Sequence, residues 1–214
     1  MSDTHLTPDL YFDLTDVEFC DIFDNCTRVW DPIRKLDDYI AAQFETGKIR
    51  ANYKDSTDIY VGDGTVIEDN VLINGPAIIG KNCTIRHGAY FRLGVLIGNE
   101  ALIGHCSEIK HAIVMNNVTV PHMSVVSDSI LGNKVNIAGG AITANQRLDR
   151  GPVKITHGDK NIETGLLKLG AVVGDNSNIG VNSVLNPGTI LGKNTVVYPL
   201  TSVKGIHGPG SIIR

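Results

Sequence analysis

Apolar residues recur at every sixth position over most of this sequence, and this period restricts the possible folds more than any other feature. From Val61 onward, ten consecutive residues at intervals of six are large and apolar before Pro121 ends the run. Neither an α-helix, with 3.6 residues per turn, nor a simple strand, with a period of two, has this repeat. The members of the two runs are Val61, Ile67, Ile73, Ile79, Ile85, Phe91, Ile97, Ile103, Ile109 and Met115, and then Val173, Ile179, Leu185, Leu191, Val197 and Val203.

A six-residue period is typical of a three-sided prism. Each hexad forms one flat face with a short strand, its large residue points to the axis, and the glycine or polar residue that follows turns the corner. Three hexads close one coil, and successive coils stack as parallel strands about 4.8 Å apart. We therefore predict an all-β fold, a parallel β-helix, over residues 56–214.

Residues 1–55 have helical spacing instead. Pro32 suits the first turn of a helix and Gly47 the position after its end. We predict two short helices that form an N-terminal helical cap over the open end of the prism; an arm that docks a partner is the alternative. The two apolar stripes are Val17, Cys20, Ile22 and Phe23, and Ile33, Leu36, Ile40 and Phe44.

A long stretch at about residues 144–170 breaks the six-residue period and is too long for a corner. Long loops on rigid scaffolds often carry function, so we expect part of a site here. The loop is rich in charge, with Arg147, Arg150, Lys154, Lys160 and Lys168 against Asp149, Asp159 and Glu163.

Two cations occupy the same corner of adjacent coils in the predicted prism. Arg92 and Lys110 are one full coil apart, and Asn74 precedes them in the same column. Two stacked cations repel each other unless an anion lies over them, and a phosphate would suit an Arg fork beside a Lys point charge. Two solvated surface cations are the alternative interpretation of the spacing.

His122 follows Pro121 at another predicted corner, two hexads after Lys110 and therefore on a different face. An exposed histidine can accept a proton near neutral pH, so His122 is a candidate general base, although an isolated histidine is often only a surface residue. Other histidines, at positions 87, 105 and 111, show no repeated ligand geometry. We therefore predict no metal site.

The net charge, the cysteine spacing and the apolar segments together exclude several classes of partner and location. A net charge of −4 gives no general attraction to nucleic acid or to anionic membranes. The four cysteines show no CxxC and no paired Cys/His spacing, which predicts free thiols in a reducing compartment. The N-terminus has no signal-peptide pattern and no segment approaches the roughly 20 apolar residues of a membrane span. We expect a cytoplasmic enzyme or binding protein.

One run of the sequence has a specific resemblance. The segment EIKHAIVMNNVTVPHMSVVSDSILGNKVNIAGGAITAN, from Glu108 to Asn145, resembles the glucosamine-1-phosphate N-acetyltransferase domain of the bifunctional N-acetylglucosamine-1-phosphate uridyltransferases. Through FRLG, TANQRLDRGPVKI and KLGAVVGDNSNIGVNSVLNPGTILG, it is still more similar to the C-terminal domain of archaeal-type sugar-1-phosphate nucleotidylyltransferases. The resemblance covers roughly residues 91–203 and implies the hexapeptide-repeat acyltransferase family, whose β-helices are left-handed.

The resemblance assigns roles to individual positions. It implies that Arg92 and Lys110 bind a sugar phosphate, that His122 is catalytic, and that Asn136 lies in the sugar pocket. It also implies substrate-binding roles for Asn145 and for Lys154, one of the loop lysines. The family is trimeric, with active sites in the grooves between subunits and acetyl-CoA along the later coils. The residues that bind acetyl-CoA stay unassigned.

The sequence also departs from the family pattern. Val125 stands where the family has a tyrosine three positions after the catalytic histidine, and Gln146 stands where bacterial members have another tyrosine. The part of the chain before Val61 contains no glycine-rich nucleotide loop, so uridylyl transfer is not expected.

We therefore predict an acetyl-CoA-dependent N-acetyltransferase of the sugar-1-phosphate type, acting on a hexosamine 1-phosphate or a related amino sugar without a metal. The alternative is a non-catalytic trimeric β-helix module that regulates or scaffolds a separate sugar nucleotidyltransferase. A third hypothesis is an acyltransferase that uses another acyl chain or a nucleotide-linked amino sugar.

Overall fold

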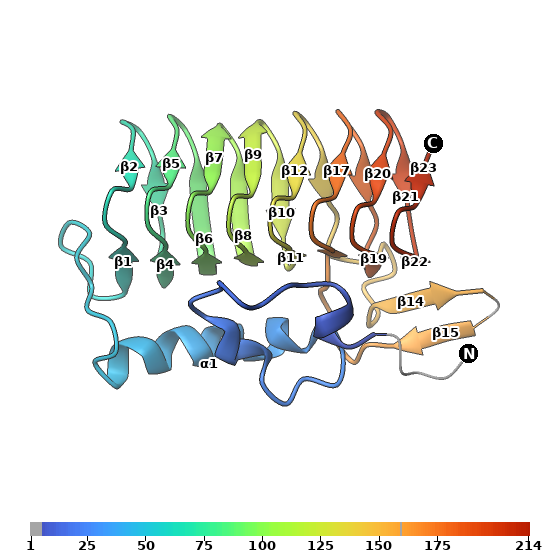
Figure 1. Ribbon diagram of the computed structural model, residues 1–214, viewed down its shortest axis with the longest axis horizontal. Coiled ribbons are helices and arrows are strands. Elements are labelled where there is room, and N and C mark those ends of the chain that lie inside the picture. Colours follow the sequence, from blue (N-terminus) through green and yellow to red (C-terminus); the bar gives the residue numbers. More distant parts are fainter. Residues whose placement is uncertain (1–5, 159) are drawn as a thin grey trace.

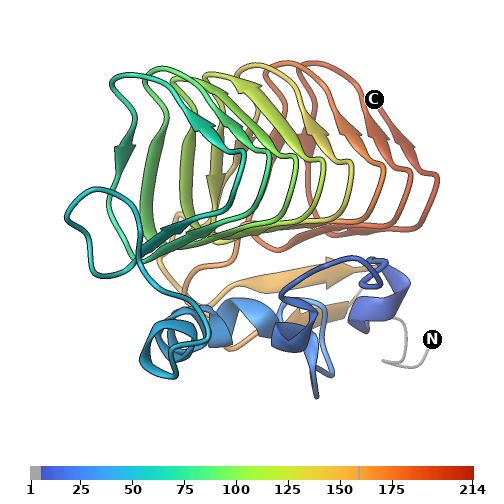
Figure 2. The ribbon, with the colours of Figure 1, turned by 60° about the vertical axis from the view of Figure 1, so that its left-hand side comes forward.

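The computed structural model describes residues 6–158 and 160–214. Parallel strands wind into a three-sided prism, with an N-terminal helical segment and a hairpin along one side (Figure 1; Figure 2). This is the parallel β-helix that the six-residue period predicts, and its hexapeptide repeats are those of the left-handed form.

Each face of the prism is a stack of short parallel strands. The first face contains β1 (Ile59–Val61), β4 (Ala77–Ile79), the second halves of β6 (Tyr90–Ile97) and β8 (Glu108–Val114), β11 (Ile130–Leu131), β16 (Ala171–Val173), β19 (Thr189–Leu191) and β22 (Ile206–His207). The second face contains β2 (Val66–Ile67), β5 (Thr84–Ile85), β7 (Leu102–His105), β9 (Thr119–His122), β12 (Asn136–Ile137), β17 (Asn178–Ile179), β20 (Val196–Val197) and β23 (Ile212–Ile213). The third face contains β3 (Leu72–Ile73), the first halves of β6 and β8, β10 (Val125–Ser127), β13 (Ile142–Thr143), β18 (Val184–Leu185) and β21 (Ser202–Val203).

The axial core follows the predicted period with one correction. The first coils keep the full spacing of three hexads, so that Ile79 pairs with Ile97, but Ile97 pairs with Val114, one position short of a full coil. Val114 therefore points into the axis, and Met115, which the regular count places there, packs on the outside of the prism. The period thus slips at the corner within β8, before the break at Pro121 that the sequence suggests. Its cause is a corner that is one residue shorter than the corner within β6.

The N-terminal segment lies along the side of the prism, and the prediction that it covers the open end is wrong (Figure 2). The second predicted helix is α1 (Asp31–Glu45), whereas the first is only a short 3-10 turn, η3 (Cys20–Phe23), preceded by η2 (Pro8–Leu10). The physical reason is that alternate residues of the first face point outward and are apolar, so this face needs a cover. They include Leu96, Ile113, Ile130, Val172 and Ile190, all fully buried by the segment and the hairpin.

A ladder of asparagines holds the N-terminal segment at the corner between the first and second faces. The side-chain oxygen of Asn116 accepts a hydrogen bond from the backbone N–H of Asn99 at 2.8 Å, and that of Asn133 accepts one from the backbone N–H of Asn116 at 3.2 Å. The Nδ2 groups of Asn116 and Asn133 donate outward to the backbone oxygens of Asp16 and Asp13, both at 2.8 Å. The same side chains therefore join successive coils and dock the segment.

The off-period stretch after β13 leaves the prism at the corner between the third and first faces. It carries an antiparallel hairpin of β14 (Lys154–His157) and β15 (Lys160–Glu163). Val153 and Ile155 join the apolar cluster beneath the N-terminal segment. Across residues 6–158 and 160–214, no helix has the length and apolar character needed to cross a membrane.

Candidate active site

Arg92 and Lys110 lie in register on adjacent coils, as their spacing predicts. They lie at the corner between the third and first faces, which we call the cation corner and define by Arg92, Lys110, Asp128 and Asn145. Asn74 belongs to the neighbouring coil, where its Nδ2 donates to the hydroxyl of Tyr90 at 3.1 Å. The column thus exists as a stack of polar side chains at one edge of the prism.

Both cations are already paired with carboxylates of the same chain. Nε and Nη2 of Arg92 contact Oε1 of Glu108 at 2.8 and 2.7 Å. Nζ of Lys110 donates to Oδ2 of Asp128 at 2.6 Å. The Arg92 side chain is 34% exposed and that of Lys110 only 8%. Arg92 is therefore the cation that an anionic ligand can reach, while Lys110 is held inside the corner.

Asp128 is the centre of this network. Its carboxylate accepts a hydrogen bond from Lys110, lies 3.0 Å from Nδ1 of His111, and accepts another hydrogen bond from Nδ2 of Asn145. Burial raises the pKa of this carboxyl, but the hydrogen bonds from His111, Lys110 and Asn145 outweigh burial and lower the pKa to about 2. Asp128 therefore stays ionised and holds three side chains in fixed positions.

Two elements from distant parts of the sequence close over the cation corner. Asp37, on α1, lies 3.7 Å from Nε2 of His111 through its Oδ1. The long insertion begins and ends here, since the backbone N–H of Leu169 donates to the oxygen of Asn145 at 2.9 Å and that of Gly170 to the oxygen of Asp128 at 2.8 Å. The N-terminal segment and the insertion therefore both contact the same polar network.

His122 lies at a different corner, between the second and third faces, at the end of β9. His105 pairs with His122 in register, and the rings of His87 and His105 stack with their centroids 6.0 Å apart. We call this column of His87, His105 and His122 the histidine corner. All three side chains are exposed. Within the described chain the imidazole of His122 has no hydrogen-bonding partner, so a substrate or another subunit can approach it.

The other predicted residues are placed on further elements. Asn136, on the second face, accepts a hydrogen bond from the hydroxyl of Thr119 at 2.7 Å. Lys154, in the hairpin, pairs with Glu163 at 2.8 Å. Three of the six predicted residues therefore meet at the cation corner, and three lie elsewhere in the chain; the first set is Arg92, Lys110 and Asn145, and the second is His122, Asn136 and Lys154.

The sequence-based prediction omitted Glu108 and Asp128, the two acids that neutralise the cations. A signal for each was present. Glu108 lies two positions before Lys110 and thus on the same side of a strand, and Asp128 follows Ser127, the register partner of Lys110 on the next coil. The stack of cations therefore does not require an external anion, because its repulsion is offset by these carboxylates.

No set of three or more His, Cys, Asp or Glu side chains within residues 6–158 and 160–214 is arranged to hold a metal ion. The chemistry that the two corners offer is anion binding at Arg92, fixed hydrogen bonds around Asp128, and proton acceptance at His122.

Comparison with known proteins identifies both parts of the β-helix. Residues 73–156 match the family described as GMPPB C-terminal domain, and residues 170–198 match the hexapeptide repeat of succinyl-transferase. The chain is 35% identical over 170 residues to the bifunctional protein GlmU of Methanocaldococcus jannaschii, an alignment that covers 78% of this chain and 41% of the relative. It spans about two fifths of the length of the bifunctional relatives it matches.

A second relative has a length closer to that of this chain. The putative uncharacterized acetyltransferase YaiX of Escherichia coli K12 is 34% identical over 174 residues, which cover 73% of this chain and 74% of the relative. Among solved structures, the UDP-N-acetylglucosamine acyltransferase of Arabidopsis shares the fold, with a TM-score of 0.51 and 15% identity over 74% of this chain and 58% of that one. The chain therefore belongs to the hexapeptide-repeat family of acyltransferases and is homologous to the bifunctional sugar-1-phosphate nucleotidyltransferase/acetyltransferases of the GlmU type.

Proposed function

We propose that this chain is a cytoplasmic acetyl-CoA-dependent N-acetyltransferase whose acceptor is a hexosamine 1-phosphate or a related amino sugar. The observation that carries the proposal is the cation corner, where Arg92 and Lys110 stack in register and Asn145 joins them through Asp128. The homologous bifunctional proteins support it, because one of them is the bifunctional sugar-1-phosphate nucleotidylyltransferase/acetyltransferase of Sulfurisphaera tokodaii.

The burial of the two cations assigns them different tasks in this proposal. Arg92 contacts the phosphate, because its guanidinium is partly exposed and can share its five N–H donors between Glu108 and a ligand. Lys110 stays with Asp128 and adds positive potential behind the phosphate. Asn145 and Asn136 bind the sugar, and Lys154 contributes from the hairpin.

The transfer itself is a direct attack without a covalent enzyme intermediate or a required metal. The amine nitrogen of the sugar forms a bond to the acetyl carbon as the carbon–sulfur bond of the thioester breaks. His122 accepts the proton that the nitrogen loses and returns it to the departing CoA thiolate. Amide donors such as Asn136 or Asn145 stabilise the oxyanion that forms on the acetyl oxygen.

The separation of His122 from the cation corner within one chain supports an active site completed between subunits of a homotrimer. The first face is covered by the N-terminal segment, so subunit contacts fall to the other two faces. Outward side chains of the third face form an apolar column in register, which supports a contact there: Leu72, Tyr90, Val125, Ile142 and Val184, interrupted by Glu108. Leu72 is 56% exposed and Ile142 40%.

The test is release of CoA thiol from acetyl-CoA with glucosamine 1-phosphate, with free glucosamine as the comparison acceptor. We expect turnover with the phosphate and much weaker turnover without it. His122→Ala should abolish turnover, whereas His87→Ala, a matched exposed histidine in the same column, should retain it. Equal turnover in His122→Ala and the unaltered protein contradicts the role of His122.

Glu108 and Asp128 also favour a second candidate, because they neutralise both cations without a substrate. This candidate is the non-catalytic trimeric β-helix module that regulates or scaffolds a separate nucleotidyltransferase, and Val125 in place of the family's tyrosine agrees with it. Calorimetry with acetyl-CoA distinguishes the two, since the module is not expected to bind acetyl-CoA even at millimolar concentration.

A further inference from the structure

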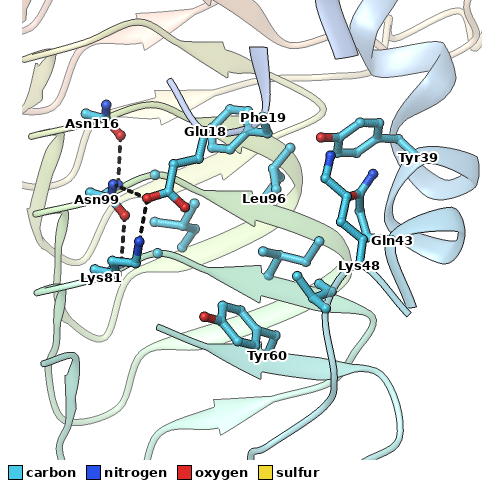
Figure 3. Close-up of a pocket in the computed structure, with 15 residues that line it drawn as sticks. Glu18, Phe19, Tyr39, Gln43, Lys48, Tyr60, Lys81, Leu96, Asn99 and Asn116 are labelled. Atoms are coloured by element: carbon cyan, nitrogen blue, oxygen red, sulfur yellow. Dashed lines mark hydrogen bonds and ion pairs between the residues drawn. The ribbon is translucent and has the colours of Figure 1, made fainter. Parts of the chain in front are cut away.

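A cavity of about 270 Å³ lies between the N-terminal segment and the side of the prism, away from both corners described above (Figure 3). Tyr39, Gln43 and Lys48 line it from the N-terminal segment, and Lys81 and Asn99 line it from the prism. The residues proposed for acetyl transfer do not contribute to its lining. Cavities between two layers of a protein are common ligand sites, and this one is at the small end of their usual size.

The floor of the cavity is flat and apolar. Ile78 and Leu96 are register partners on adjacent strands, β4 and β6, and both point outward from the first face. The rings of Phe19, Tyr39 and Tyr60 surround them (Figure 3). A planar ring can lie on such a floor and contact aromatic side chains at its edges.

Two polar side chains reach this apolar space without a partner. Within the described part of the chain, the amide of Gln43 and the hydroxyl of Tyr60 make no hydrogen bond or ion pair, and both side chains are half-buried. The Gln43 amide has donors and acceptors side by side. This combination matches the edge of a heteroaromatic ring that presents a neighbouring acceptor and donor, as a nucleobase does.

The charges around the cavity cancel. Lys81 pairs with Glu18 at 2.8 Å, and Lys48 pairs with Asp21 at 3.2 Å. Glu18 also accepts a hydrogen bond from Nδ2 of Asn99 at 3.1 Å. Because no net charge is left over, a neutral ligand is favoured over an anion. A carboxylate beside an amide and an ammonium is suited to binding the hydroxyl groups of a sugar.

We propose that this cavity binds a nucleoside. The base lies on Ile78 and Leu96 with its edge toward Gln43, and the sugar hydroxyls point to Glu18 and Lys81 at the opposite end, where Figure 3 shows those side chains. A ligand in this position contacts the N-terminal segment and the prism together. It therefore stabilises their docking, which also involves α1 above the cation corner.

Equilibrium dialysis of the full chain with radiolabelled uridine and adenosine tests this site. We expect saturable binding of at least one nucleoside, with one site per chain. Uracil, adenine and ribose should bind more weakly than the intact nucleosides. The 5′-monophosphates should bind no more tightly, because the charges of the cavity already cancel. Tighter binding of the monophosphates, or equal binding of free ribose, overturns the proposal.

Substitutions then locate the binding. Gln43→Met preserves helix propensity and volume but removes the amide, so nucleoside affinity should fall about tenfold. Tyr60→Phe is a second, milder variant with the same expected direction. Gln146→Met, at an exposed glutamine of the insertion, is the matched control and should bind normally. The proposal is overturned if neither nucleoside binds, or if Gln146→Met weakens binding while Gln43→Met does not.

Discussion

The cation corner and the histidine corner are built from the same repeat, yet they are opposite in character. At the cation corner, Lys110 and Asp128 are buried, paired with each other and contacted by α1 and the insertion, and only Arg92 is partly exposed. At the histidine corner, three imidazoles are exposed and nothing in the described chain covers them. The inner charges of the cation corner are therefore neutralised within a single chain, whereas the histidine corner presents all its imidazoles outward.

This difference separates structural from functional constraint. A residue such as Asp128 contributes to stability because its loss leaves buried donors without their hydrogen-bond acceptor and counter-ion. A residue such as His122 contributes little to stability, because its side chain is exposed to water in the folded chain as it is in the unfolded chain. Substitutions at the two corners should therefore change different measurements.

The largest expected effect is that of Asp128→Ala. This substitution leaves the buried ammonium of Lys110 without its counter-ion and removes the hydrogen-bond acceptor of Asn145. We expect a loss of about 3–5 kcal/mol in the free energy of unfolding, measured by urea titration. Asp69→Ala, an exposed aspartate one coil before His87, is the control and should change stability by no more than about 0.5 kcal/mol. Similar urea midpoints for the two variants would refute the contrast between the corners.

The second effect is a dependence of stability on pH. The pKa of Asp128 is lowered from 3.8 to about 2 in the folded chain, so its contribution is fully present above its unfolded pKa. The contribution is lost as pH falls from about 4 to about 2, and it amounts to about 2 kcal/mol. Urea titrations across this window should show a steep decline for the unaltered protein. Asp128→Asn should have a lower stability at neutral pH and a shallower decline; parallel pH profiles would count against the assignment.

The periodic part of the molecule could be predicted from sequence, because each inward residue is selected by one local rule. Ile79 and Ile97 point into the axis whatever lies outside the prism. The slip at Val114 could not be predicted, since it depends on a corner that is one residue shorter. The position of the N-terminal segment could not be predicted either. The six-residue period identifies inward residues, and it does not show whether outward residues such as Leu96 and Ile113 are covered or exposed.

The candidate site also has a part that could be predicted from the sequence and a part that could not. The stacking of Arg92 on Lys110 follows from counting along the repeat. The network around Asp128 does not, since Asn145 and the helix residue Asp37 are brought to it by an insertion and by a segment outside the repeat. Counting residues along the repeat predicts which side chains are neighbours on the prism. It cannot predict the contacts of the N-terminal segment and the insertion, which lie outside the repeat.

A smaller stability effect is expected for Arg92→Gln, at the outer part of the cation corner. The ion pair with Glu108 is partly exposed, so its loss should cost about 1 kcal/mol or less. Under the proposed function, KM for glucosamine 1-phosphate should rise about tenfold or more, because a charge-assisted contact to phosphate is lost. Lys193→Gln breaks an ion pair outside both proposed sites, with Asp175 at 3.6 Å, and should leave KM unchanged. An unchanged KM in Arg92→Gln would remove this residue from the phosphate site.

The smallest stability effect is expected at the histidine corner. His122→Ala and His105→Ala replace exposed side chains, and each should change the free energy of unfolding by about 0.5 kcal/mol or less. The two differ in the thiol-release assay, where only His122→Ala should lose turnover, because His105 lies one coil before the reacting group. Loss of turnover in both variants would mean that the histidines act as a stacked unit, and a marked loss of stability in either would show that this corner is as structural as the other.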